Sequence, residues 1–433
     1  MRENFFNHNP FLWGTATSSH QIEGNNQHND WWAWEQTSRV KYASGAACDH
    51  FNRFRDDFDL IQKLGHNAYR FSIEWSRIEP EENRWDESAL QTYHEMTRVL
   101  KSKNIEPIVT LHHFTNPQWF AEKGGWLARE APEYFSRYVK KVVHALGENV
   151  RFWITINEPL IYLSHSYFLG VWPPGHTSFK DALKVFENLL LAHINAYREI
   201  HFIYESILHQ PVWVSIAKHM LYSEPCRKYS LTDQLSVFLR GWFFNDLFLH
   251  AATSGFLYFP GLFCKLLPFH HTLDFIGINY YSRHFVRFRR LSQEALFGDM
   301  CDDSHHESQI AEKNSLGWQV YADGLYRSLM SMRRFRLPVM ITENGICTED
   351  DDQRCRFIRN HLDALRRAQG KIPIMGYLYW SLLDNFEWDK GFSPKFGIVG
   401  VDFRNFDRKV RKSAYVLADV CRKLGHGKKG DSG

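Results

Sequence analysis

Two glutamates stand at the ends of strand-like runs in different halves of the chain. Glu343 lies in LPVMITENG (337–345), where a short apolar run meets a carboxylate and Asn-Gly then turns the chain. Glu158 lies in FWITINEP (152–159), which has the same design. Glycoside hydrolysis requires two carboxyl groups, one to protonate a leaving oxygen and one to attack or to activate water. This chemistry is available only if a closed sheet brings both strand ends to one rim.

The elements that would position the two glutamates alternate along the chain as strand and helix. The expected strands are 11–17, 68–73, 107–111, 152–156, 212–217, 274–279, 338–342 and 374–380. The expected helices are 50–64, 87–103, one after 131, 179–201, 231–252, 318–334, 352–369 and 412–423. Eight such units predict parallel pairing and an α/β fold, the closed (β/α)8 barrel. We expect one barrel domain over 1–425, a long surface loop over 283–315 and a disordered basic tail over 426–433.

Barrel enzymes collect their chemistry at the C-terminal ends of the strands. Most of the expected strands end in polar or aromatic residues, a repetition that a purely structural barrel does not need. Within or just after the strands come Gln21, Arg70, His113, Asn157, Glu158, Asn279, Tyr281, Glu343, Trp380, Glu387 and Trp388. This pattern makes them candidate site residues.

Each candidate also has a purely structural interpretation. Glu158 and Glu343 could be ordinary salt-bridge residues, although their matching strand-end settings disfavour this for the pair. Arg70, inside an apolar strand, must be paired, either with any acid or with Glu343, which it would hold ionised. The other structural roles are core packing for His113, Trp380 and Trp388, a loop-fixing amide for Gln21 and a solvated acid for Glu387.

Composition and charge exclude several classes of function. The 433 residues are 44% hydrophobic and 16% aromatic, enough for a large core and for rings that line a carbohydrate cleft. The net charge of +3 gives no electrostatic reason to expect nucleic acid or membrane as a partner. The N-terminus lacks the apolar core of a signal peptide, and the apolar region 243–269 is broken by polar residues and prolines. We expect a cytoplasmic protein. We also expect residues 256–269 to pack in the core rather than to form an interface or a pocket for an apolar ligand.

The cysteines predict neither a metal nor a disulfide. All seven are scattered and form no CxxC pair, which disfavours zinc and a disulfide framework and fits a reducing compartment. The pair His305 and His306 could suggest a metal, but a solvated loop is the favoured interpretation. We therefore expect no metal and no organic cofactor.

Seven stretches together resemble glycoside hydrolase family 1, the β-glucosidase and β-galactosidase group of retaining enzymes. They are FLWGTAT (11–17), HQIEG (20–24), YRFSI (69–73), TINEP (155–159), NYY (279–281), ITENG (341–345) and WSLLDNFEW (380–388). A single NEP or ENG triplet is weak evidence, but all seven occur in the family's order and at expected strand ends. The resemblance extends from about residue 11 to 403, nearly the whole chain.

The resemblance implies a role for each candidate. Glu158 would be the acid/base and Glu343 the nucleophile, with Tyr281 and Arg70 beside the nucleophile and Asn279 on the acid/base side. The hydroxyls of the non-reducing sugar would be held by Gln21, His113, Asn157 and Glu387, with Trp380 as floor and Trp388 as wall, and Phe396 would fill a later aromatic position. The residues at 387, 388 and 396 also differ from those of the phosphosugar-specific branch. This difference favours unphosphorylated sugars as substrates.

The chain departs from the family's pattern at several points. Residues 114–117 (FTNP) stand where the family often has Trp-Asp-Leu-Pro, and Phe392 stands where Tyr is frequent. The chain is also somewhat short between the fifth and seventh expected strands. These differences put in doubt the wall beside the first sugar and the rim beyond it.

The implied activity is hydrolysis of terminal β-D-glucosyl residues, and of β-D-galactosyl or β-D-fucosyl residues, through a covalent glycosyl-enzyme. Glu343 would be ionised and Glu158 protonated, because two like charges so close repel, with the carboxyl groups about 5–5.5 Å apart. The partner is a small glycoside or oligosaccharide; the preferred sugar, the aglycone and the oligomeric state, a homo-oligomer included, stay open. The alternatives are a transglycosidase with the same residues and a non-catalytic sugar receptor, which typically lacks one carboxylate.

Overall fold

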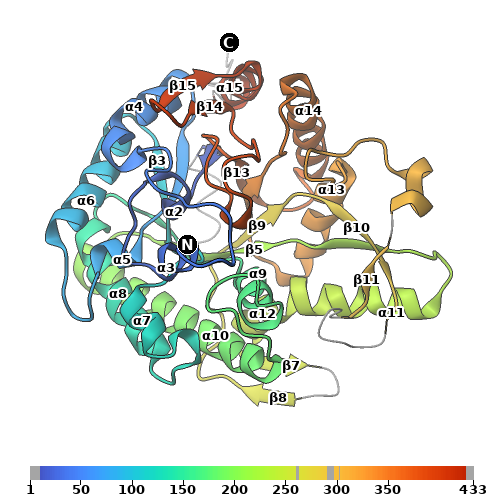
Figure 1. Ribbon diagram of the computed structural model, residues 1–433, viewed down its shortest axis with the longest axis horizontal. Helices are drawn as coiled ribbons and strands as arrows, with labels where there is room; N and C mark the ends of the chain where they lie inside the picture. The colour runs from blue at the N-terminus through green and yellow to red at the C-terminus, as the bar shows by residue number, and fades with distance from the viewer. Residues whose placement is uncertain (1–9, 260–262, 290–296, 302, 426–433) are drawn as a thin grey trace, which may run out of the picture.

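The computed structural model describes residues 10–259, 263–289, 297–301 and 303–425. Parallel strands close into a barrel in the order β1-β13-β12-β9-β5-β4-β3-β2 (Figure 1). These strands are β1 (Leu12–Ala16), β2 (Ala68–Ser72), β3 (Glu106–His112), β4 (Phe152–Asn157), β5 (Trp213–His219), β9 (Ile276–Tyr280), β12 (Val339–Asn344) and β13 (Ile374–Trp380). The predicted (β/α)8 barrel is confirmed, while the tail predicted over 426–433 lies outside the described residues.

The barrel strands are buried on both faces. Every residue of β2, β4, β12 and β13 is buried, as expected when side chains fill the barrel on one side and helices cover the other. Such strands form as continuous apolar runs, so a charged residue inside one needs a partner. Arg70 in β2 is such a residue, with none of its surface exposed.

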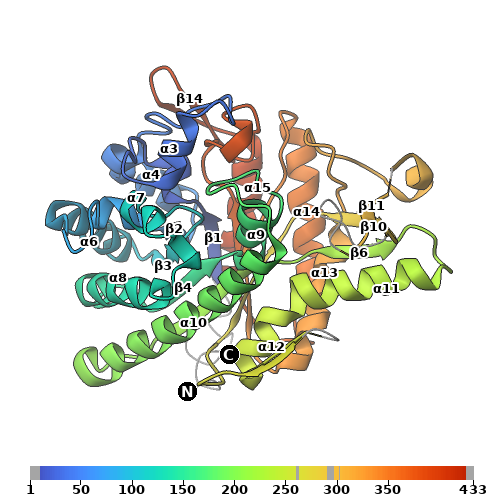
Figure 2. The ribbon, with the colours of Figure 1, turned by 60° about the horizontal axis from the view of Figure 1, so that its bottom comes forward.

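Amphipathic helices pack around the outside of the barrel (Figure 2). They are α4 (His50–Lys63), α6 (Glu87–Ser102), α8 (Ala131–Leu146), α10 (Phe179–Ile203), α11 (Leu231–Arg240), α12 (Leu247–Ser254), α13 (Ala322–Ser331), α14 (Asp351–Ala368) and α15 (Lys412–Gly425). In α8 the buried residues recur at helical spacing, from Phe135 through Tyr138 and Val142 to Leu146. Side chains of Asp86 and Ser178 cap α6 and α10 by accepting from backbone amides.

The prediction of a surface loop over 283–315 is wrong for the first half of this segment. Strand β10 (Arg283–Arg287) pairs in parallel with β6 (Tyr222–Pro225) and antiparallel with β11 (Asp299–Met300), and a 3-10 turn (Asp303–Gln309) follows. Phe285 and Val286 of β10 are buried. This small sheet, with α11 packed against it, extends to one side of the barrel in both views (Figures 1 and 2). Strand β10 was not predicted because charged residues flank its short apolar centre.

The expectation that the cysteines form no disulfide is also wrong. Cys226 follows β6 and Cys301 follows β11, and the two form a disulfide with their Cα atoms 6.0 Å apart. The partners are separated by 75 positions, so their pairing depends on the small sheet and leaves no trace in local spacing. Cys48, Cys264, Cys347, Cys355 and Cys421 are free.

The apolar stretch after α12 contains two paired strands rather than a core segment. Strands β7 (Phe256–Phe259) and β8 (Phe263–Leu266) pair antiparallel. Leu257 and Leu267 are buried, but Phe256 is 48% exposed and Leu266 is 69% exposed, so the expected core packing holds for only part of it. Among the described residues, no helix has the length and hydrophobicity that a membrane crossing requires.

Gly14 tests the packing of the closed barrel. A Cβ atom at this position would lie 1.8 Å from the carbonyl oxygen of Ala68 on the adjacent strand β2. We expect Gly14→Ala to destabilise the protein by at least about 2 kcal/mol, because backbone atoms must move to relieve the overlap. Thermal unfolding followed by circular dichroism would measure this. Gly241→Ala is the control, since nothing lies within 4 Å of its Cβ; equal melting temperatures for the two variants would contradict the prediction.

Candidate active site

Both strand-end glutamates lie beside a break in strand register. The pairing of β12 with β9 shifts between Ile341 and Glu343, and that of β4 with β5 shifts between Ile154 and Asn157. Irregularities of this kind redirect side chains next to the extra residue. Glu158 itself takes a left-handed backbone conformation (φ 43°) and begins helix α9 (Pro159–Leu163). As a result both carboxyl groups face one cavity of about 440 Å³.

Most of the predicted site residues line this cavity. They are Gln21, His113, Asn157, Glu158, Tyr281, Glu343, Trp380, Glu387, Trp388 and Phe396. Arg70 and Asn279 are fully buried directly behind the lining and bind residues that form it. The fold therefore brings together the side chains that the strand-end rule selected from distant parts of the chain.

Two donors hold the carboxylate of Glu343. Arg70 Nη1 donates to Oε1 at 2.6 Å, and the Tyr281 hydroxyl donates to Oε2 at 2.5 Å. Arg70 Nε also donates to Thr110 Oγ1 at 2.9 Å, which fixes the plane of the guanidinium. Of the two partners considered for Arg70, the structure shows Glu343. Both donors stabilise the ionised form of this carboxyl group.

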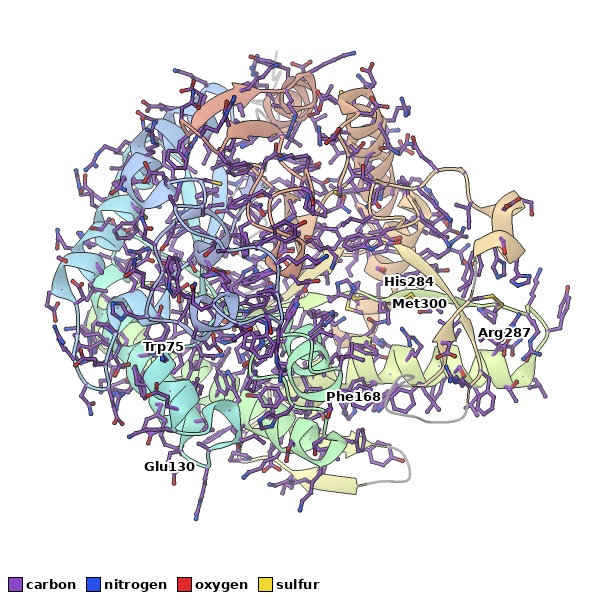
Figure 3. All side chains as sticks on the ribbon, viewed as in Figure 1. Trp75, Glu130, Phe168, His284, Arg287 and Met300 are labelled. Atoms are coloured by element: carbon purple, nitrogen blue, oxygen red, sulfur yellow. A yellow bond between two sulfur atoms is a disulfide. The ribbon has the colours of Figure 1, made fainter. Side chains whose placement is uncertain are left out.

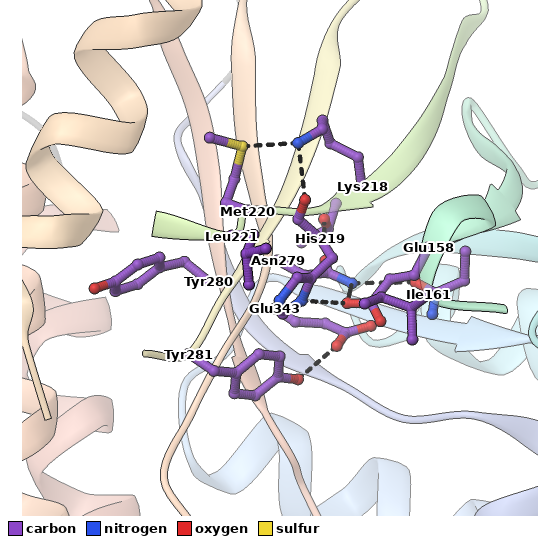
Figure 4. A network of polar contacts seen from close by, with 12 residues as sticks. Glu158, Ile161, Lys218, His219, Met220, Leu221, Asn279, Tyr280, Tyr281 and Glu343 are labelled. Atoms are coloured by element: carbon purple, nitrogen blue, oxygen red, sulfur yellow. Dashed lines mark hydrogen bonds and ion pairs between the residues drawn. The ribbon is translucent and has the colours of Figure 1, made fainter. Parts of the chain in front are cut away.

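A chain of hydrogen bonds through Arg70, Asn157 and Asn279 joins the two carboxyl groups, and Figure 4 shows how Asn279 lies beside Glu158 and Tyr281 beside Glu343. Arg70 Nη2 donates to Asn157 Oδ1 at 2.7 Å, and Asn279 Nδ2 donates to the same oxygen at 3.2 Å. Asn279 Nδ2 also donates to Glu158 Oε1 at 2.8 Å, and its own Oδ1 accepts from Thr342 at 2.7 Å. The two glutamates are therefore held in a fixed relation through buried side chains.

The pKa values of the two carboxyl groups shift in opposite directions. Burial raises the pKa of Glu343 to about 7 against the effect of Arg70, and the charge of Glu158 adds to the rise. Burial also acts to raise the pKa of Glu158, but His219, Asn279 and Arg70 outweigh it and lower that pKa. These directions are the reverse of the expectation that Glu158 alone would hold the proton.

Interacting groups titrate as a pair rather than singly. Because the charge of Glu158 is one cause of the raised pKa of Glu343, a proton placed on Glu158 removes that cause and favours an ionised Glu343 beside Arg70. Since Oε1 of Glu158 accepts from Asn279, a proton on this carboxyl group would sit on Oε2. Between its two titration steps the pair holds one proton.

One end of the cavity combines hydrogen-bonding groups with aromatic walls. Gln21 Nε2 donates to Glu387 Oε2 at 3.0 Å, and the ring of His113 stacks parallel to that of Trp380 with centroids 5.8 Å apart. Burial and the charge of Glu343 raise the pKa of Glu387 to about 8. Because Glu387 is half-buried in the cavity lining and accepts from Gln21, it is not a solvated surface acid. Trp388 packs against this end as well. Polar groups beside flat rings suit a sugar, which has hydroxyls at its edge and C–H faces.

The mouth of the cavity is mostly apolar. Its lining includes Ile161, Leu169, Val171, Leu221, Met300, Leu316 and Trp318. Phe396 lies between the two regions, with its ring centroid 6.1 Å from that of Tyr281 and 6.2 Å from that of Trp318. The sequence analysis identified none of the mouth residues, because Ile161 lies on α9, Met300 on β11 and the others in loops.

His219 is the main functional residue that the sequence analysis missed. It ends β5, and its Nδ1 lies 3.4 Å from Oε1 of Glu158. Its ring stacks on that of Tyr281 with centroids 6.4 Å apart. The expected strand ended two residues earlier, at 217; a longer strand would have exposed this histidine to the same strand-end rule.

The side chains with metal-ligand spacing lie apart from this cavity. In the described ranges, the group of side chains with suitable spacing is Cys226, Cys301 and His306. None of the three lines the cavity that holds Glu158 and Glu343.

A closed (β/α)8 barrel with a buried carboxyl pair beside a sugar-sized polar recess defines a glycosidase of the barrel class. The chain belongs to glycosyl hydrolase family 1, whose sequence model matches residues 2–426. It is accordingly a β-glucosidase-like O-glycosyl hydrolase, as its relatives also indicate.

Relatives match over almost their full lengths. The chain is 31% identical to β-glucosidase A of Acetivibrio thermocellus, over 96% of this chain and 98% of the relative. Among solved structures, a β-glycosidase from Pyrococcus horikoshii superposes with a TM-score of 0.87 at 42% identity, covering 95% of this chain and 94% of that one. The β-glucosidase from Thermotoga maritima in complex with glucoimidazole gives a TM-score of 0.87 at 32% identity, covering 96% and 98%.

Tyr281→Phe tests the hydrogen bond to Glu343. Loss of the hydroxyl removes a donor that lowers the pKa of Glu343. Because Glu343 has the higher pKa of the pair, we expect the alkaline limb of the kcat/KM profile to move up by roughly 0.5–1 pH unit. We also expect kcat/KM at the optimum to fall roughly 10²-fold. The control is Tyr280→Phe, whose hydroxyl binds the backbone oxygen of Tyr321 outside the cavity. An unshifted alkaline limb in Tyr281→Phe would contradict this prediction.

His219→Asn tests the contact with Glu158. The imidazole lowers the pKa of Glu158, which is the lower pKa of the pair, so its removal should raise that pKa and move the acid limb of kcat/KM upward by roughly 0.5 pH unit. The alkaline limb, which depends on Glu343, should move less. Profiles measured on a nitrophenyl glycoside would check both limbs, and a downward shift of the acid limb would refute the expected sign.

Proposed function

We propose that the chain is a retaining β-glycosidase that cleaves terminal non-reducing β-D-glucosyl residues, and β-D-galactosyl or β-D-fucosyl residues, through a covalent glycosyl-enzyme. The observation that carries the proposal is the pair of hydrogen bonds to the Glu343 carboxylate. Arg70 donates to one of its oxygens and Tyr281 to the other. A carboxylate that is fixed and buried in this way is suited to attack a carbon atom rather than to position water.

In the first step, Glu343 attacks the anomeric carbon while Glu158 protonates the departing oxygen. The bond from the sugar to its leaving group breaks as the bond to Glu343 forms, and the proton moves from Oε2 of Glu158 to the leaving oxygen. Arg70 also donates to Asn157 at 2.7 Å, a contact made through its second terminal nitrogen that does not require the charge on Glu343.

In the second step, Glu158 acts as a base. It takes a proton from a water molecule, which attacks the anomeric carbon from the side that the leaving group has vacated, and Glu343 departs as a carboxylate. His219 and Asn279 both favour a charged Glu158, so they assist this step. Two inversions at one carbon retain its configuration.

The glycone would occupy the polar end of the cavity. Gln21, His113, Asn157 and Glu387 face this space and offer hydrogen bonds to sugar hydroxyls, with Trp380 and Trp388 against the C–H faces. Burial keeps the imidazole of His113 neutral by lowering its pKa, so its ring can both donate and accept. The Thermotoga maritima relative binds glucoimidazole and castanospermine, which supports a sugar-shaped ligand here.

The apolar mouth favours transglycosylation as a second candidate outcome. A wall that includes Ile161, Leu169 and Leu221 could hold an alcohol in the position that water takes in the second step. Product analysis with an added alcohol would separate the two outcomes, because a transglycosidase gives alkyl glycoside and little free sugar. A non-catalytic receptor is disfavoured because both carboxyl groups are present and connected.

Labelling with a 2-deoxy-2-fluoro β-glucoside tests the covalent intermediate. We expect mass spectrometry of the intact protein to show the addition of one sugar, and peptide mapping to place it on Glu343. Glu343→Gln is the matched control and should stay unlabelled, with kcat lower by roughly 10⁴-fold or more. Labelling of the variant, or a label on a different residue, would overturn the assignment.

Glu158→Gln tests the acid role separately. Without the proton donor, glycosides with poor leaving groups should lose about 10²–10⁴-fold in kcat/KM, while activated aryl glycosides lose far less. Initial rates on an alkyl glycoside and on a dinitrophenyl glycoside would measure the difference. Equal losses on the two substrates would count against Glu158 as the acid.

A further inference from the structure

Two cysteines and a histidine converge on the small sheet beside the barrel. Cys226 follows β6, Cys301 follows β11, and His306 lies in the 3-10 turn that comes next. Their two sulfur atoms and one ring nitrogen all lie within 4.8 Å of one another. The group therefore has the size of a metal coordination sphere, in which ligand atoms about 2.0–2.3 Å from one ion lie within about 4 Å of each other.

The central strand β10 fixes all three side chains. The backbone amide of Cys226 donates to the oxygen of Val286 at 2.8 Å, and that of Cys301 donates to the oxygen of Phe285 at 2.8 Å. The ring of His306 stacks on that of Phe285 with centroids 3.7 Å apart. Two cysteines thus approach from opposite edges of one strand, and the imidazole lies buried over it. This is a built arrangement rather than a chance meeting of surface side chains.

We propose that the reduced form of this cluster binds one Zn²⁺ ion, with Cys226 Sγ, Cys301 Sγ and the imidazole of His306 as ligands. The Cys226–Cys301 disulfide is then the oxidised, metal-free form of the same site. The fourth position falls to water, because Cys301 also lines a surface recess of about 340 Å³. This site is separate from the glycosidase chemistry and does not depend on it.

Charge and ligand type select the ion. Two thiolates neutralise the two positive charges of Zn²⁺, and a neutral imidazole adds none, so the site can be partly buried without a net charge. Mg²⁺ and Ca²⁺ prefer oxygen ligands, and sulfur with imidazole nitrogen suits Zn²⁺.

The site lies behind the mouth of the active-site cavity. Met300 precedes Cys301 in the chain and lines that cavity, as does His284 of β10 (Figure 3). A metal ion would therefore link the ends of the two edge strands, β6 and β11, on either side of β10, and the disulfide would do so in its place under oxidising conditions.

The conversion between the two forms balances with a phosphine as the reductant. The S–S bond accepts two electrons from the phosphine, which becomes a phosphine oxide with an oxygen atom from water, and each sulfur takes one proton. Binding of Zn²⁺ then releases the two thiol protons to the buffer.

The test is metal titration of the full chain under anaerobic conditions, after reduction and removal of the phosphine. Co²⁺ serves as the spectroscopic probe, since thiolate ligands give a sulfur-to-cobalt charge-transfer band, and Zn²⁺ is then added in competition. We expect one equivalent of metal per chain and release of two protons, read with an indicator dye. The air-oxidised protein should bind none at this site.

Matched variants separate this site from other thiols. Cys226→Ser and Cys301→Ser should lose the charge-transfer band, and His306→Ala should bind at least roughly tenfold more weakly. Cys264→Ser is the control, because Cys264 is free, exposed and remote from the cluster in sequence; it should bind as the wild type does. Where a serine variant fails to fold, by circular dichroism, the comparison of His306→Ala with Cys264→Ser decides. Equal binding by all variants, or no metal bound by the reduced wild type, would overturn the proposal.

Discussion

A single buried positive charge organises the interior of this barrel. Arg70 has no exposed surface, and its guanidinium reaches Glu343, Asn157 and Thr110 on three different strands. A buried ion is tolerated only when it is paired, and removal of one partner typically costs about 3–5 kcal/mol. The ion pair therefore constrains where β2, β3, β4 and β12 can lie relative to one another, and the site geometry follows from that constraint.

The sequence predicted the barrel and the carboxyl pair because both depend on local patterns. Apolar runs of strand length recur between amphipathic segments, and the polar residues that follow them can be assigned to one rim by topology alone. His219 was not predicted as a site residue because the end of β5 was placed at 217. A boundary error of two residues is enough to leave a strand-end side chain out of the candidates. The pKa shifts of Glu158 and Glu343 were not predicted either. They depend on burial and on a neighbour, His219, that the sequence analysis did not identify.

The small sheet could not be predicted for a different reason. Strand β10 pairs with β6, which lies well before it in the chain, and its buried centre is only Phe285 and Val286 between charged residues. Neither strand has a periodic pattern long enough to be read alone. The disulfide and the cluster with His306 depend on that pairing, so they were hidden together with it. Long-range contacts of this type become visible only when the fold is known.

The breaks in register beside Glu158 and Glu343 have a consequence for engineering. In a regular strand, moving by one residue turns a side chain from the inside of the sheet to the outside. Each glutamate therefore owes its direction to an interruption of the backbone ladder as much as to its place in the chain. Transplanting the two acids onto an idealised barrel with unbroken strands would point one or both of them at the surrounding helices, so a successful graft must carry the irregular backbone along with the side chains.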